Sequence, residues 1–308
     1  MSGSLSEAVV HIENFKMNFG STTVIRDLSF DVFRGETFGF LGSNGSGKTT
    51  TIRALLGIYQ PTGGTLHVNG APFSPERSGK LGYLPEERGL YKKESVIDVM
   101  TYFGKLKGLS RATAIHWSTN YLERVGLADK AKVRLDKLSS GQQQKIQLGV
   151  TLMNEPVLLI LDEPTKGFDP VNRRLLMDII DEQKQAGATV LMVTHQMEEV
   201  ERLCDRVILL KDGVSRAYGT ISEVQSQFGE EFIHIEHEGS ISPSPLFTIT
   251  RSESGFSELK AADGVSASKI LNSLVASGLA VTSFLPKKPS LDDIFLEVYG
   301  AQAAREVA

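Results

Sequence analysis

One octapeptide, Gly42-Ser43-Asn44-Gly45-Ser46-Gly47-Lys48-Thr49, constrains this chain more than any other stretch. It fits the pattern G-x-x-x-x-G-K-[ST], the phosphate-binding P-loop. The apolar residues 37–41 before it predict a buried strand, and residues 50–56 after it predict a helix that ends at Gly57. Between a strand and a helix, the backbone N–H groups of such a turn converge on one anion. The loop therefore predicts a nucleotide site in which Lys48 reaches the β- and γ-phosphates and Thr49 binds Mg²⁺.

Composition limits what surrounds this loop. The chain has 308 residues, enough for one large domain and a smaller one, and its 41% hydrophobic and 23% charged content is typical of globular proteins. The lone Cys204 excludes an intrachain disulfide and fits a reducing compartment. The net charge of −4 comes from residues 231–308, and the chain shows no clustered basic surface. We therefore expect no nucleic-acid partner.

Neither the N-terminal residues nor the apolar runs of the sequence suggest insertion into a membrane. Residues 1–7 have no basic region or apolar core, so we expect no signal peptide. The longest apolar runs, such as Val157–Leu161, are too short to cross a bilayer. We therefore expect that the chain does not insert into a membrane by itself, which leaves it free to dock onto a membrane protein.

Periodicity predicts an α/β fold with two domains. Residues 8–41 have a β pattern, whereas the segment from Ser95 to about Asn154 has helical spacing and predicts an inserted helical subdomain over about 92–154. Beyond it, strands alternate with helices, which indicates βαβ units around a mostly parallel sheet. We predict a P-loop NTPase domain over 8–228, with an N-terminal antiparallel β subdomain.

Composition changes after Gly229, and a small α+β domain is predicted over 231–308. Ser290 and Asp293 resemble a capping box that starts the last helix. The other predicted elements are three strands and a helix, at 231–237, 245–251, 279–285 and 267–277.

Two carboxylates, Asp162 and Glu163, end an apolar strand directly before Pro164. In a P-loop sheet this strand end lies beside the phosphate loop, so Asp162 can hold Mg²⁺ directly or through water. Glu163 is placed to orient or deprotonate the attacking water in hydrolysis. The alternative is a solvated acidic strand end, which the apolar residues 157–161 disfavour.

A second anion site is predicted where Leu138–Gln144 opens a helix through Ser and Gly. Alone, this segment would be an ordinary helix start. Its helix leads directly into the strand that carries Asp162 and Glu163, which favours a functional role.

In this order the motifs resemble those of an ATP-binding cassette (ABC) ATPase subunit, over roughly residues 8–225. The P-loop corresponds to its Walker A motif, and Leu161-Asp162-Glu163-Pro164 to Walker B with the catalytic glutamate. Leu138-Ser139-Ser140-Gly141-Gln142 is similar to the LSGGQ signature, with Ser140 replacing the first glycine. The signature makes the resemblance specific, because other P-loop families lack it.

The same resemblance assigns the remaining site residues. Gly167-Phe168-Asp169-Pro170 resembles the D-loop, His195 the switch histidine, and Phe19 the aromatic that stacks on adenine. Glu86 stands where most members have a glutamine that senses Mg²⁺ and contacts the membrane subunit, so we expect a coupling role and leave its Mg²⁺ role open. The residues predicted to bind ATP are Phe19, Gly42, Ser43, Asn44, Gly45, Ser46, Gly47, Lys48, Thr49 and Thr50.

The resemblance also implies a composite mechanism. Two such domains sandwich two ATP molecules head to tail, and each site combines the Walker motifs of one subunit with residues 139–142 of the other. With one Walker A motif and one signature, the chain is expected to act as a homodimer or with a homologous subunit.

Two segments, one of them near the C-terminus, indicate which branch of the family the chain resembles. Pro289–Glu297 and Gly82–Tyr91 are similar to ATPase subunits of an export branch, which serve separately encoded permeases, including sodium and drug exporters. We therefore expect an ATP-hydrolysing subunit at the cytoplasmic face of the cell membrane, with a regulatory or dimer-stabilising C-terminal domain.

Two alternatives belong to other functional classes. A soluble ABC ATPase acting on ribosomes or nucleic acid is disfavoured by the single cassette and the lack of a basic tract or heptad run. A cassette that holds ATP without hydrolysing it is disfavoured by the presence of Glu163 and His195.

Overall fold

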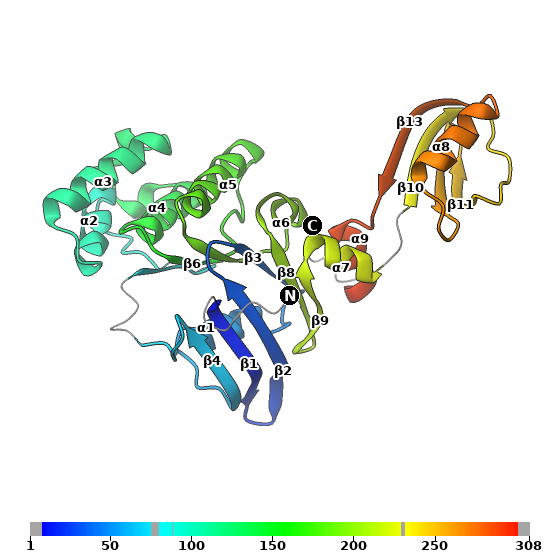
Figure 1. The fold of residues 1–308 in the computed structure, drawn as a ribbon. Helices are drawn as coiled ribbons and strands as arrows, with labels where there is room; N and C mark the ends of the chain where they lie inside the picture. Colours follow the sequence, from blue (N-terminus) through cyan, green and yellow to red (C-terminus); the bar gives the residue numbers. More distant parts are fainter. Residues whose placement is uncertain (1–7, 75–79, 88, 229–231, 301–308) are drawn as a thin grey trace. The chain divides into compact units, whose positions relative to one another are not determined.

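The chain folds into two compact units that divide between Thr220 and Ile221 (Figure 1). The computed structural model describes residues 8–74, 80–87, 89–228 and 232–300. Across these ranges, no helix has both the length and the apolar character needed to cross a membrane. Residues 231 and 301–308, which belong to the predicted C-terminal domain, lie outside the described residues. The limits 8–228 and 231–308 remain predictions.

A nine-stranded sheet forms the first unit, in the order β4-β1-β2-β9-β8-β3-β7-β6-β5. Strands β3, β5, β6, β7 and β8 pair in parallel, whereas β1 pairs antiparallel with β2 and β4. This arrangement confirms the predicted mostly parallel core with an antiparallel β subdomain. The strands are β1 (Ala8–Phe19), β2 (Thr22–Phe33), β3 (Thr37–Leu41), β4 (Gly63–Val68), β5 (Leu81–Leu84), β6 (Leu158–Asp162), β7 (Thr189–Val193), β8 (Arg206–Lys211) and β9 (Val214–Thr220).

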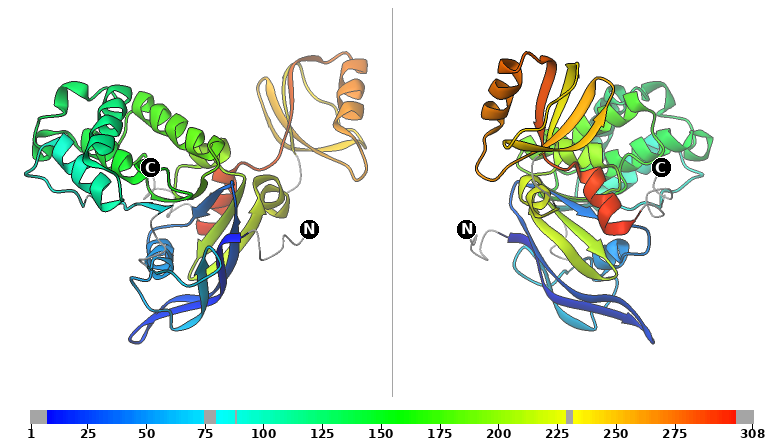
Figure 2. Two further views of the ribbon diagram at one scale, coloured as in Figure 1. Left: turned by 60° about the vertical axis from the view of Figure 1, so that its left-hand side comes forward. Right: turned by 90° about the vertical axis from the view of Figure 1, so that its right-hand side faces the viewer.

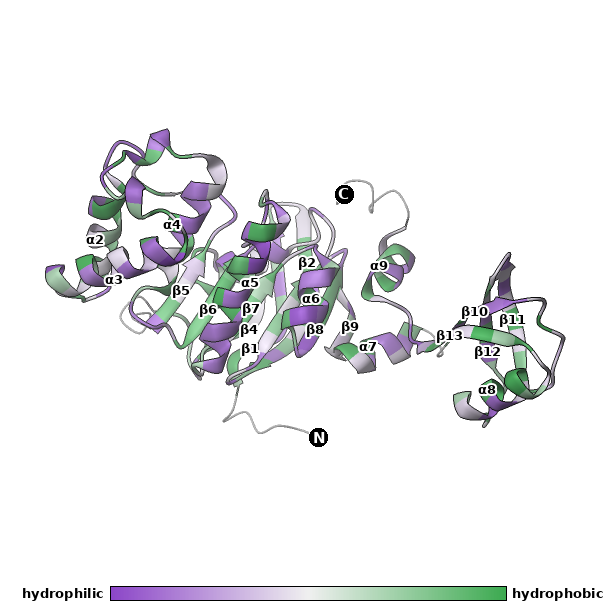
Figure 3. Ribbon diagram, turned by 90° about the horizontal axis from the view of Figure 1, so that it is seen from above, coloured by the Kyte–Doolittle hydropathy of each residue, from purple (hydrophilic) through white to green (hydrophobic). Residues whose placement is uncertain are grey.

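The central strands are buried along their whole length, because helices cover a parallel sheet. Every residue of β3, β6 and β7 is buried. In Figure 3 these strands are largely hydrophobic, while helices α5 (Pro170–Gln185) and α6 (Met197–Leu203) carry hydrophilic residues. Val157, predicted to start a buried strand, is 38% exposed, and β6 begins one residue later.

Three helices form the predicted helical region and gather at one end of the first unit (Figure 2). They are α2 (Val96–Leu106), α3 (Arg111–Arg124) and α4 (Ser140–Leu152), whereas α1 (Lys48–Leu55) follows the P-loop. Ser95 and Ser110 cap α2 and α3 by accepting hydrogen bonds from backbone N–H groups. Helix α4 approaches α3 closely at Gly149, where a Cβ atom would lie 2.4 Å from the Tyr121 ring.

The second unit holds a separate antiparallel sheet in the order β11-β12-β10-β13. Helix α8 packs on it, and its Ile270 and Leu274 join a small core with Ile233, Ile235 and Leu259. Within the same unit, Lys288 Nζ donates to the hydroxyls of Ser222 and Ser226 on α7. Its elements are α7 (Ile221–Phe228), β10 (Phe232–Glu238), β11 (Phe247–Glu253), β12 (Phe256–Ala261), α8 (Ala267–Ala276), β13 (Ala280–Lys287) and α9 (Leu291–Tyr299).

Strands β9 and β12 are absent from the sequence predictions. β9 pairs with β8 through a turn in which Asp212 and Gly213 both have positive φ. Asp-Gly is a strong hairpin signal, so the sequence did carry evidence for β9. The strand has only two buried residues, Ala217 and Gly219, which leaves little alternation to detect. The capping box of Ser290 and Asp293 is confirmed at the start of α9.

We predict that Gly149→Ala destabilises the helical region. The added methyl group would overlap the Tyr121 ring, and overpacking of this kind costs about 1–3 kcal/mol. The free energy of unfolding from urea titration measures the effect. Gly89→Ala is the control, because its Cβ would meet no atom within 4 Å. Equal stability of the two variants would contradict the close helix contact.

Candidate phosphate-binding site

Glycine is required in the P-loop because neighbouring atoms approach its backbone. A Cβ on Gly42 would lie 2.4 Å from Ser46 Oγ and 2.7 Å from the Leu210 carbonyl oxygen. Gly47 caps α1 with φ +109°, and a Cβ there would lie 2.3 Å from Ile25 Cδ1. The loop is therefore held between β3, β8 and the β1–β2 hairpin in a conformation that a larger residue would disrupt.

Lys48 is the first residue of α1, and its side chain is buried against the P-loop. Its Nζ donates to the carbonyl oxygens of Gly42, at 2.6 Å, and Ser43, at 2.9 Å. Burial lowers the pKa of Lys48, while the carboxylates of Glu163 and Asp162 act in the opposite direction. A phosphate anion would relieve this desolvation of the ammonium group.

Asp162 lies at the end of β6 with a buried carboxylate that the protein does not fully satisfy. It is 2% exposed, and its Oδ2 has no hydrogen-bond partner within the described part of the chain. Burial, followed by the charges of Glu86 and Glu163, raises the pKa of Asp162 to about 6. Buried charges normally pair or coordinate metals. Carboxylate oxygens are ligands that Mg²⁺ prefers, and Thr49, in the first turn of α1, is the residue predicted to add a hydroxyl oxygen.

Glu163 and His195 come together although 31 residues separate them in the chain. Glu163 Oε1 accepts a hydrogen bond from His195 Nδ1 at 2.7 Å. Since an ionised carboxylate can only accept, Nδ1 carries the proton in this bond. The Glu163 backbone has φ +51°, an uncommon conformation for a residue other than glycine. Its side chain is almost fully buried, whereas that of His195 is 21% exposed.

Residues 139–142 form the N-terminus of α4, as predicted. Ser139 Oγ accepts from Gln142 N–H at 3.3 Å, and Gln142 Oε1 accepts from Ser139 N–H at 3.0 Å, which is a full capping box. The Gly141 backbone faces Phe168, whose ring would lie 3.3 Å from a Cβ at that position. Ser140 is exposed and Gly141 half-buried. These contacts tie the signature to the D-loop and leave Ser140 facing solvent.

Two further predicted residues lie at element ends. Asp169 caps α5 by accepting from Asn172 N–H, and this backbone hydrogen bond lowers the pKa of Asp169. Phe19 ends β1 with 46% exposure and packs edge-on against Tyr59, with ring centroids 5.3 Å apart. The hairpin that carries Phe19 also supplies Ile25, the residue beside Gly47. An exposed ring on this hairpin is available for stacking on a base.

Glu86 is paired in a way that the sequence did not indicate. Lys166 Nζ donates to Glu86 Oε1 at 2.7 Å, which offsets the extra negative charge that replaces the usual glutamine. Lys166 and Glu86 are 80 residues apart in the chain, so no local sequence pattern indicates this pair. Gln147 of α4 donates to the carbonyl oxygens of Pro85 and Glu87 at 3.4 and 3.3 Å, and so links the Glu86 loop to the signature helix.

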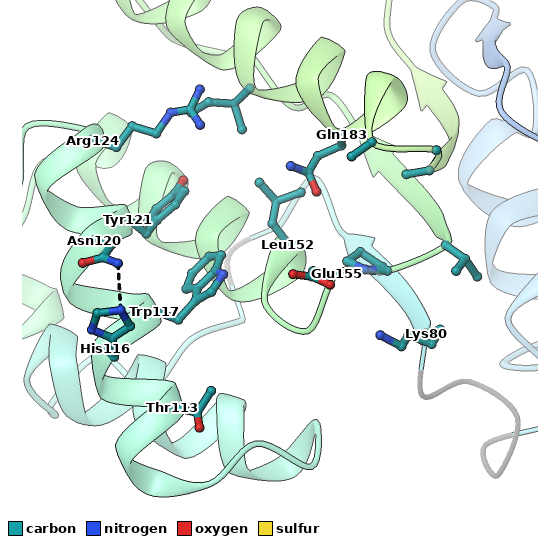
Figure 4. Close-up of a pocket in the computed structure, with 16 residues that line it drawn as sticks. Lys80, Thr113, His116, Trp117, Asn120, Tyr121, Arg124, Leu152, Glu155 and Gln183 are labelled. Carbon is teal, nitrogen blue, oxygen red and sulfur yellow. Dashed lines mark hydrogen bonds between the residues drawn. The ribbon is translucent and has the colours of Figure 1, made fainter.

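A cavity of about 730 Å³ lies elsewhere in the first unit (Figure 4). It lies between α3 and the segments that precede β6 and β7, and Trp117, His116 and Arg124 of α3 line it. None of the residues predicted to bind ATP lines this cavity. The phosphate site is therefore recognised by its chemistry and backbone geometry, not by the size of a cavity.

Comparisons with known proteins match both units. The family profile described as "ABC transporter" matches residues 25–166, and "ATP-binding protein DrrA1-3-like, C-terminal domain" matches residues 219–299. An uncharacterized ABC transporter ATP-binding protein of Methanocaldococcus jannaschii is 44% identical, over 70% of this chain and 79% of its own length. The Nod factor export ATP-binding protein I of Cupriavidus pinatubonensis is 32% identical, over 96% and 92%. The solved structure titled "Structure of ATP binding subunit of ABC transporter" is 30% identical over 72% and 93%, with a TM-score of 0.68.

We predict that Asp162→Asn stabilises the protein, measured without nucleotide or divalent cation. The pKa of Asp162 is about 6 in the folded chain, against 3.8 for an unperturbed aspartate carboxyl, so the folded state binds more protons between these values. The contribution of Asp162 to stability is therefore lost as pH rises through about 6. Above pH 7 the variant should gain about 3 kcal/mol in the free energy of unfolding, since one pKa unit corresponds to about 1.4 kcal/mol.

The gain should disappear below about pH 3, where the carboxyl is neutral in both states. Urea titration at several pH values measures this, with the exposed Asp27→Asn as control. A gain that does not change with pH would contradict the desolvated carboxylate.

Proposed function

This chain belongs to the ABC transporter family of ATP-binding proteins, and we propose that it drives a separate membrane permease in the export direction. The family assignment makes it an ATP-binding subunit with ATPase activity. The Nod factor export relative, aligned over nearly the whole chain, supports the direction of transport. The matched C-terminal domain at residues 219–299 supports the same branch of the family. The permease would hold the subunit at the cytoplasmic face of the membrane.

A surface for the permease is proposed next to the Glu86 loop. Tyr91 and Tyr102 are 56% and 45% exposed and meet edge-on, with ring centroids 5.5 Å apart. Leu106, one turn along α2 from Tyr102, is 65% exposed. Apolar side chains gathered on a surface are typical of protein interaction sites. Through Gln147, movement of the Glu86 loop would reach the signature helix.

The phosphate site carries the proposed ATP chemistry. The P-loop backbone and Lys48 bind the triphosphate, and Phe19 stacks on adenine. Thr49 and Asp162 would hold Mg²⁺, which would neutralise charge on the phosphates. The unpaired Asp162 Oδ2 is the single observation that carries this assignment, because a buried carboxylate oxygen without a partner calls for a cation.

Hydrolysis is assigned to Glu163 and His195. Glu163 orients the attacking water and accepts its proton as the new bond to the γ-phosphorus forms. The bond between that phosphorus and the bridging oxygen breaks, which releases ADP and phosphate. His195 holds the Glu163 carboxylate through the 2.7 Å hydrogen bond, so the base keeps one orientation.

The site is proposed to be completed by a second cassette. Residues 139–142 make their contacts with α4 and Phe168, and their N–H groups at the helix start suit a phosphate. We assign these residues to the γ-phosphate bound by a partner subunit, which is either a second copy or a homologue. We assign Asp169 to the same interface, because its carboxylate caps α5 at the surface.

Glu163→Gln should keep ATP binding and abolish turnover. Loss of the carboxylate base is expected to lower phosphate release by at least about 100-fold, because a positioned general base contributes that much. ATP with Mg²⁺ should then trap dimers, which light scattering after gel filtration measures. The control is Glu198→Gln, a change at an exposed position on α6. Normal turnover in Glu163→Gln would remove the role assigned to Glu163.

Capture of the tagged full chain from membranes in mild detergent tests the transporter function. We expect a multi-spanning membrane protein to be recovered with it, and mass spectrometry to identify that protein. Changing Tyr91 and Tyr102 together to Ala should reduce the recovery. Recovery of ribosomes instead of a membrane protein would favour the soluble alternative.

A further inference from the structure

Glu199 is a buried carboxylate that the proposed chemistry does not yet use. It lies on α6 with 0% exposure, and burial raises the pKa of its carboxyl against the effect of its hydrogen bonds. A carboxylate is costly to bury unless it is paired and hydrogen-bonded. The partners of Glu199 should therefore reveal what this residue does.

Two threonine hydroxyls and one guanidinium face this carboxylate. Thr165 Oγ1 donates to Glu199 Oε1, and Thr194 Oγ1 lies 3.4 Å from Glu199 Oε2. Both threonines are buried, with 2% and 0% exposure. Arg173 Nε lies 3.7 Å from Oε1 and supplies the opposite charge. Each oxygen of the carboxylate thus holds a different segment of the chain.

These segments include the residues that we propose for hydrolysis. Thr165 is two residues after Glu163, and Thr194 directly precedes His195. The Thr194 hydroxyl also accepts from Gln196 N–H at 3.1 Å, so it fixes the backbone on both sides of His195. Arg173 lies on α5, four residues after Asp169.

The backbone at Glu163 needs such support. Its φ of +51° is a conformation that a residue other than glycine keeps only when its surroundings hold it. The Thr165 bond anchors the chain just after this residue, and the Thr194 bond anchors the partner histidine. The 2.7 Å hydrogen bond between His195 and Glu163 therefore depends on the positions that these two threonine hydrogen bonds give to both segments.

We propose that Glu199 is a positioning residue for ATP hydrolysis, which acts through Thr165 and Thr194 to hold Glu163 and His195 in one geometry. This inference rests on the roles proposed above for those two residues. Glu199 is buried behind the two segments, so it orients the base without joining in the reaction. Its loss should therefore lower kcat and leave nucleotide binding intact.

Isosteric variants separate positioning from folding. Thr165→Val and Thr194→Val keep the shape and lose the hydroxyl, whereas Thr165→Ser and Thr194→Ser keep the hydroxyl. Glu199→Gln removes the charge, and the exposed neighbouring change Glu198→Gln is its control. Each full-length variant is measured for kcat and KM of ATP hydrolysis, for affinity towards a fluorescent ATP analogue and for its melting temperature.

We expect Glu199→Gln and both valine variants to lower kcat by about 10-fold or more, because small displacements of a catalytic group have effects of this size. KM and analogue affinity should stay within about twofold of the parent, since the P-loop is unchanged. The serine variants should recover most of the lost kcat. The double variant Thr165→Val with Glu199→Gln should have a kcat no lower than that of Glu199→Gln alone, since the effects of coupled residues are not additive.

Two results would overturn the inference. One is a kcat in the valine variants equal to that of Glu198→Gln. The other is a loss of activity that follows the melting temperature and is not recovered by serine. Glu163→Gln is measured in parallel: if it keeps turnover, the role proposed for Glu163 is wrong, whereas its inactivity beside active valine variants rejects only the role of Glu199.

Discussion

Burial of charge that the protein does not itself neutralise is the constraint on which the site depends. Burial lowers the pKa of Lys48, and burial with nearby carboxylates raises that of Asp162. Both shifts disfavour the charged forms, and Asp162 Oδ2 and Ser46 Oγ have no partners within the described residues. A triphosphate and a divalent cation would satisfy both groups together. The loop is therefore built for a ligand that carries charges of both signs.

The parallel sheet is what brings these groups together. Strand β3 lies next to β7, and β7 next to β6, so their carboxyl ends meet at one edge. The P-loop follows β3, Asp162 ends β6, and His195 follows β7. The signature starts α4 in the helical region and contacts Phe168 and its own helix. The assignment of the signature to another subunit's nucleotide rests on the resemblance to the family, in which two cassettes share each site.

The sequence predicted those parts of the site that are local along the chain. The strand–loop–helix around the P-loop, the capped start of α4 and the acidic end of β6 all follow from neighbouring residues. Lys166 and Glu199 act through partners 80 and 34 residues away, so no local pattern identifies them. β9 and β12 are absent from the prediction because their hydrophobic alternation is weak; the turn at Asp212-Gly213 is evident in the sequence, but the strand after it is not.

The structure of Glu163→Gln with ATP and Mg²⁺ tests the central claim most directly. We expect two cassettes head to tail, with each triphosphate between the P-loop of one and residues 139–142 of the other. The Asp162 carboxylate should face the cation, and the Phe19 ring the adenine. A single cassette that closes its own signature over the γ-phosphate would contradict this account, as would a nucleotide bound away from the P-loop.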